Sequence, residues 1–231
     1  MSSEERKVNV DPRISLNKLG EFLTTNPARR KKILLDQKYP SEFIVTRYND
    51  AENAIIEYLF DNKNNTAILD KALEAIGSKR SQTEWEEQNK GLNYEAVDSF
   101  YDIADQIDFT KFKVEKSTKI ESASILIEGV QISVRPEIFI YKEKGDEKTI
   151  GAIKLYFSKT YSLSDEAGEY IASFVMEYLK TTKTECVPSN KLCNVIDVFN
   201  QKIFIAPISY KRRMLDIRAA CQEISAIWSR L

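Results

Sequence analysis

The hydrophobic pattern of the chain changes its period near residue 110, and this change limits the folds available. Before that point apolar side chains recur every three to four residues, as at Leu16, Leu19 and Leu23, which predicts amphipathic helices. From residue 111 onward, segments rich in Ile, Val, Phe and Tyr are separated by turn signals such as Glu128-Gly129, which predicts strands. Helical patterns return only twice in the strand-rich part. The expected fold class is therefore α+β, or mixed α/β, around one sheet.

Start and stop signals give the approximate bounds of these elements. Asn26 before Pro27 marks a helix start, and Gly77 marks a helix end. We expect helices at 15–25, 26–38, 49–60, 66–78, 81–109 (broken near Gly91), 163–182 and 210–231. We expect strands at 111–117, 124–134, 137–143, 149–159, 194–200 and 202–209. The predicted organisation is a mobile tail (1–13), a helical N-terminal region (14–80), and an α/β core with a C-terminal helix (81–231).

Composition places the chain among globular proteins. Of its 231 residues 42% are apolar and 30% are charged, and the formal net charge is −1. The first residues, MSSEERKVNVDPR, lack the apolar core of a secretory signal, and no apolar run is long enough to span a membrane. We therefore expect a cytoplasmic protein that does not enter a membrane. The three cysteines lack CxxC spacing, so we expect buried thiols rather than a zinc site.

The chain contains no histidine, and this absence excludes several kinds of catalysis. Triads that use an imidazole base and HExxH zinc sites cannot form. The glycine-rich loops that bind nucleotide phosphates are also missing, so no nucleotide or organic cofactor is expected. Any catalysis would depend on carboxylate, lysine or tyrosine side chains, or on a metal with oxygen ligands, for which Mg²⁺ or Mn²⁺ is best suited.

One hairpin-like stretch, VRPEIFIYKEKGDEKTIGAIKLYFSK, places a carboxylate and an ammonium group close in register. Glu137 opens the first strand, and Lys154 lies between apolar neighbours in the second. Two interpretations are open. The pair is either part of an active site or a cross-strand ion pair at a sheet edge, which would contribute at most about 1 kcal/mol.

Residues 94–207, in their order of elements and their short motifs, resemble the core of the PD-(D/E)XK nuclease superfamily. RPEI resembles the segment that carries a metal-binding acid, which implies this role for Glu137, and GAIKL resembles the acid-x-lysine strand, which implies a catalytic role for Lys154. The chain departs from the pattern at Ala152, where the family has an acid. The resemblance then implies a substitute metal ligand from Glu166, which precedes a tyrosine as in exonuclease-like members, or from Glu95 or Asp98.

Basic clusters supply candidate phosphate contacts. The candidates are Arg29, Arg30, Lys31 and Lys32 in one cluster, and Lys211, Arg212 and Arg213 in the other. The first hypothesis is a nuclease-like protein that binds or acts on DNA or RNA, with Mg²⁺-dependent phosphodiester hydrolysis as a possible activity. The alternative is a non-catalytic protein that binds a protein partner, or a second copy of itself, through its C-terminal helix.

Overall fold

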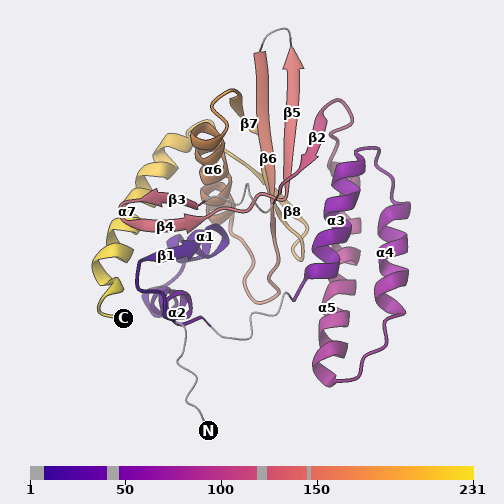
Figure 1. The fold of residues 1–231 in the computed structure, drawn as a ribbon, viewed down its shortest axis with the longest axis horizontal. Coiled ribbons are helices and arrows are strands. Elements are labelled where there is room, and N and C mark those ends of the chain that lie inside the picture. Colours follow the sequence, from indigo (N-terminus) through magenta and orange to yellow (C-terminus); the bar gives the residue numbers. More distant parts are fainter. Residues whose placement is uncertain (1–7, 41–46, 119–123, 145–146) are drawn as a thin grey trace.

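The computed structural model describes residues 8–40, 47–118, 124–144 and 147–231. In this part of the chain the fold is α+β, as the sequence predicts (Figure 1). The helices are α1 (Leu16–Leu23), α2 (Pro27–Lys38), α3 (Asn49–Asp61), α4 (Ala67–Gly77), α5 (Glu84–Tyr101), η1 (Ala104–Gln106), α6 (Asp165–Thr182) and α7 (Tyr210–Trp228). The strands are β1 (Arg13–Ser15), β2 (Lys113–Lys116), β3 (Ser124–Ile127), β4 (Val130–Ser133), β5 (Ile138–Lys144), β6 (Glu147–Tyr156), β7 (Val187–Asp197) and β8 (Lys202–Ile205).

The larger sheet has the strand order β2-β5-β6-β7-β8. Strands β5 and β6 form an antiparallel hairpin, α6 then crosses over, and β7 pairs with β6 in parallel. Strand β8 returns antiparallel to β7. A smaller sheet has the order β1-β4-β3, and its first strand pairs in parallel with β4. The chain therefore forms two sheets, where the sequence analysis expected one.

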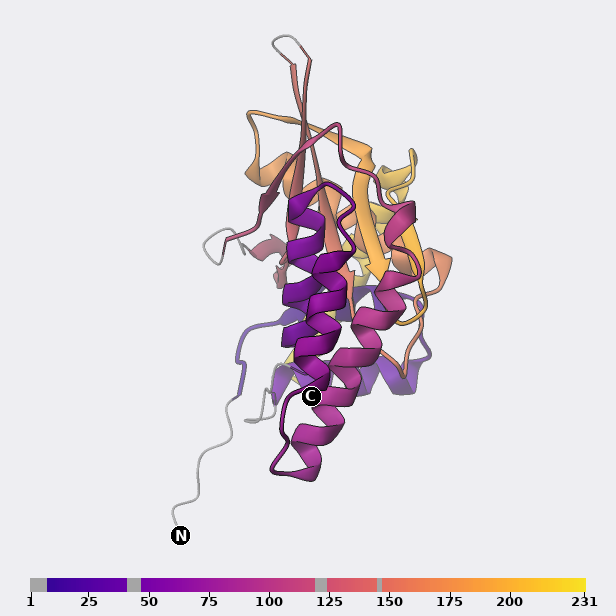
Figure 2. The same ribbon diagram turned by 90° about the vertical axis from the view of Figure 1, so that its right-hand side faces the viewer.

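Apolar cores lie on both faces of the larger sheet, because its inner strands alternate their side chains. Phe139 and Ala152 belong to a core shared with α1, α2, α6, α7 and the small sheet. Ile140 and Ile153 belong to a second core shared with α3, α4 and α5. Figure 2 shows these three helices packed side by side over their face of the sheet. The helices of residues 14–80 are thus divided between the two faces.

The N-terminal segment is tied to the C-terminal helix. The indole Nε1 of Trp228 donates to the carbonyl oxygens of Asn9 (3.2 Å) and Val10 (3.0 Å), and Arg13 opens β1. Residues 9–13 of the predicted tail are therefore held by hydrogen bonds and by the start of β1, whereas residues 1–7 lie outside the described residues. The same contacts hold α7 in place, with Ile217, Ile224 and other apolar side chains buried inside the chain.

Helix α5 differs from the helix that the sequence predicts. The expected break near Gly91 is wrong, because α5 is continuous from Glu84 to Tyr101. A capping box formed by Thr83 and Glu86 starts this helix. No described helix combines the length and the apolar character that a membrane span requires.

Candidate functional site

The hairpin of β5 and β6 brings Glu137 and Lys154 together. Ile138 pairs with Ile153, so the residue before β5 lies opposite Lys154 on the same face of the sheet. The ammonium Nζ of Lys154 donates to Glu137 Oε1, and the backbone N–H of Leu155 donates to Oε2 at 2.7 Å. Both residues are only 8% exposed. The pair is thus buried between inner strands rather than exposed at a sheet edge.

Burial dominates the electrostatics of this pair. Loss of hydration raises the pKa of Glu137 to about 7, although the Lys154 ammonium and the Leu155 N–H both favour the ionised carboxylate. A buried ion pair contributes little net stability compared with apolar side chains, but removal of one partner leaves a costly charge. The pair therefore fixes the position of Lys154 more than it stabilises the fold.

The raised pKa of Glu137 predicts a pH dependence of stability. The folded state binds the proton more tightly than the unfolded state, so this contribution is largest below pH 4.5 and is lost as pH rises through about 7. In the double variant Glu137→Gln/Lys154→Met both charged groups are gone. We expect the stability difference between parent and double variant to fall by more than about 1 kcal/mol between pH 4.5 and pH 7.5. Urea unfolding at several pH values measures this stability difference, and a stability difference that stays constant or grows with pH contradicts the prediction.

The surroundings of Ala152 leave no room for a second carboxylate. Ala152 is fully buried, and its register partners are Phe139 on β5 and Cys193 on β7. Glu137 is thus the only acid beside Lys154 in this register, and both its oxygens are engaged. In the described part of the chain, no three His, Cys, Asp or Glu side chains gather to hold a metal ion. These residues do not fit a magnesium site of the expected kind.

The other three predicted metal ligands lie in other surroundings. Glu166, at the start of α6, accepts from Arg213 at 3.1 Å and from the Tyr170 hydroxyl at 3.3 Å. Glu95 forms an ion pair with Lys159 at 2.6 Å. Asp98 is exposed on α5, the helix that covers the opposite face of the sheet. The structure does not bring these side chains to Glu137.

Some of the predicted phosphate contacts are engaged within the chain. The Arg29 guanidinium donates to the fully buried carboxylate of Glu21, which also pairs with Lys18. Arg30 donates to two backbone carbonyls, and Arg213 pairs with Glu169 at 2.6 Å. The remaining four predicted contacts are exposed: Lys31, Lys32, Lys211 and Arg212.

A pocket of about 260 Å³ opens beside Lys154. It is lined by Ser15, Leu16 and Asn17 at the start of α1, by Ser133 at the end of β4, by Arg135 between β4 and β5, and by Lys154; we call it the Lys154 pocket. None of the described residues that line it carries a carboxylate. Arg135 is exposed and has no ion-pair partner among the described residues.

Helix α1 is fixed over this pocket. Its N-cap is Ser15, whose hydroxyl oxygen accepts from the Lys18 N–H. The Asn17 amide donates to the carbonyl oxygen of Leu155 at 3.2 Å, across 138 positions of sequence. The first N–H groups of a helix lack intrahelical acceptors and carry a partial positive charge. The pocket therefore combines a helix start, the Arg135 guanidinium, the ammonium of the Lys154–Glu137 pair and two hydroxyl groups, a set suited to an anion.

Sequence reasoning identified Lys154 but missed the other residues of the pocket. The local signals are Ser15, a good N-cap residue before Leu16, and Arg135, which directly precedes Pro136-Glu137. The contact between α1 and β6 is not visible in the sequence. No protein-family model and no curated protein matches the chain.

Proposed function

We propose that the protein binds nucleic acid, and that the Lys154 pocket holds a phosphate of the sugar–phosphate backbone. The observation that carries the proposal is the lining of this pocket. Lys154 and Arg135 face the start of α1 with no carboxylate among the lining residues. Phosphate oxygens receive a large share of protein–nucleic acid hydrogen bonds, mainly from such cations, hydroxyls and helix starts.

Each group in the pocket has a distinct role in this proposal. The Arg135 guanidinium can donate two parallel hydrogen bonds to one phosphate, and its exposure lets it meet a strand that passes over the surface. One ammonium N–H of Lys154 donates to Glu137, which leaves two N–H groups for a ligand. Ser15 and Ser133, which are register partners on the paired strands β1 and β4, supply two hydroxyl groups side by side.

The proposal keeps the resemblance to PD-(D/E)XK nucleases as a hypothesis. Strands β5 and β6, helix α6 and strand β7 follow one another in the element order expected from the sequence. The proposed activity is binding rather than hydrolysis. Glu137 is already held by Lys154 and Leu155, and Ala152 cannot provide the second acid that a metal-activated water would need.

Fluorescence anisotropy with single- and double-stranded DNA and RNA tests the proposal. We expect Arg135→Ala to weaken binding about tenfold and to lower the salt slope by about one, because one phosphate contact is lost. Lys71→Ala is the matched control, since Lys71 is an exposed cation on α4, over the other face of the sheet.

Two outcomes contradict the binding proposal. One is the absence of binding by the parent protein at low salt, and the other is an equal loss of affinity in Arg135→Ala and Lys71→Ala. Mg²⁺ or Mn²⁺ added to the same samples tests for cleavage. Cleavage of the nucleic acid by the parent protein that is lost in Glu137→Ala would show that the protein hydrolyses nucleic acid as well as binding it.

A further inference from the structure

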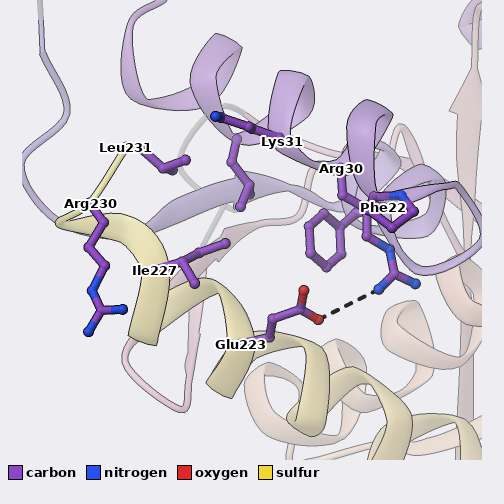
Figure 3. Close-up of a pocket in the computed structure, with 9 residues that line it drawn as sticks. Phe22, Arg30, Lys31, Glu223, Ile227, Arg230 and Leu231 are labelled. Carbon is purple, nitrogen blue, oxygen red and sulfur yellow. Dashed lines mark ion pairs between the residues drawn. The ribbon is translucent and has the colours of Figure 1, made fainter.

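A second pocket, of about 270 Å³, lies between α2 and α7 and shares no lining residue with the Lys154 pocket. Its apolar part includes Phe22, Leu34 and Ile227, which come from three different helices. Phe22 and Leu34 are almost fully buried, whereas Ile227 is partly exposed. Figure 3 shows the Phe22 ring and the Ile227 side chain facing the same space. We call this the α2–α7 pocket.

One side of this pocket is closed by an ion pair between Arg30 and Glu223. Arg30 forms an ion pair with Glu223 at 3.6 Å and lies over the Phe22 ring, 5.1 Å from its centre. Its Nε and Nη2 groups donate to the carbonyl oxygens of Thr25 and Leu23, both at 3.2 Å. Arg30 is therefore held in position, and the charge of Glu223 is balanced.

The rest of the pocket rim carries an excess of positive charge. Lys31 and Arg230 also line the pocket, at two separate edges away from the Arg30–Glu223 pair (Figure 3). Both are exposed, and neither has an ion-pair partner among the described residues. An apolar floor beside two uncompensated cations suits a ligand with an apolar body and one negative charge.

We propose that the α2–α7 pocket binds a small amphipathic carboxylate, such as a medium-chain fatty acid. The alkyl chain lies against Phe22, Leu34 and Ile227, and the carboxylate meets Lys31 at the rim. The small volume favours a short chain over a bulky ligand. This inference is independent of nucleic-acid binding, because no residue is shared between the two pockets.

Calorimetry with octanoate and the full chain tests this site, with octanol as the uncharged comparison. We expect saturable octanoate binding with Kd below about 1 mM, and octanol binding at least about fivefold weaker. Ile227→Glu places a charge in the apolar floor and should abolish binding. Lys31→Glu should weaken it about fivefold, whereas Lys32→Glu, one residue further along α2 and outside the pocket lining, should leave it unchanged.

Three results would overturn the inference. The first is no saturable octanoate binding by the parent protein. The second is octanol binding as tight as octanoate binding, which would remove the role of the cations. The third is unchanged octanoate affinity in Ile227→Glu, which would place the ligand elsewhere. Circular dichroism spectra of each variant exclude unfolding as the cause of lost binding.

Discussion

Replacement of Lys154 by methionine is expected to destabilise the protein by about 3 kcal/mol at about pH 9. Glu137, whose pKa is about 7, is ionised there beside Lys154, and the variant must bury that charge without its cation or bind a proton about two pH units above this pKa. Both residues are only 8% exposed, and water cannot readily replace the lost partner. The Leu155 N–H would still donate to Oε2, which compensates only a part of the loss. Urea unfolding monitored by tryptophan fluorescence measures the effect.

The double variant Glu137→Gln/Lys154→Met is the control for this experiment. It removes both charges and keeps an amide oxygen that can accept from Leu155, so we expect it to recover most of the stability lost in Lys154→Met. A loss below about 1 kcal/mol in the single variant, with no recovery in the double variant, would show that the pair is solvated like a surface ion pair.

Replacement of Gly151 by alanine is expected to destabilise the protein by more than about 3 kcal/mol, because the added methyl group would collide with the neighbouring strand. A Cβ atom at this position would lie 2.1 Å from the Cβ and 2.3 Å from the carbonyl oxygen of Leu192. The clash involves backbone atoms, so rotation of a side chain cannot relieve it. Gly151 lies at the register irregularity between β6 and β7, three residues before Lys154.

Gly91→Ala is the matched control, since it makes the same chemical change in α5 where nothing lies within 4 Å of the added atom. Here we expect stabilisation of about 0.5–1 kcal/mol, because alanine has the higher helix propensity. Thermal and urea unfolding of both variants measure the contrast. Equal stability of Gly151→Ala and the parent would contradict the close approach of β6 and β7.

The accuracy of the sequence predictions depended on the range of the interactions involved. Asn26 caps α2 as its sequence context indicates, because an N-cap bonds to an N–H only three residues away. Gly91 led to the wrong prediction of a helix break, since a glycine inside a helix is tolerated when the surrounding helix is strong and its start is well capped. Strand β1 was missed because three residues carry no periodic signal.

For the candidate site, too, short-range contacts were predictable from the sequence and long-range contacts were not. Glu137 and Lys154 are neighbours across one hairpin, so their contact was predictable from local strand register. The part of the pocket formed by Ser15 and Asn17 depends on α1 docking against β6, a contact of long range for which one sequence holds no signal. Likewise, the partner of Arg29 is the buried Glu21, where sequence reasoning expected a phosphate.

Mapping of the backbone amides by NMR during titration with a short oligonucleotide tests whether the Lys154 pocket holds a backbone phosphate. We expect the largest shifts at the start of α1, around Leu16 and Asn17, and at Ser133 and Arg135, and we expect Arg135→Ala to reduce them. Shifts confined to Lys31 and Lys32, or to Lys211 and Arg212, would contradict the claim by placing the nucleic acid on a different surface.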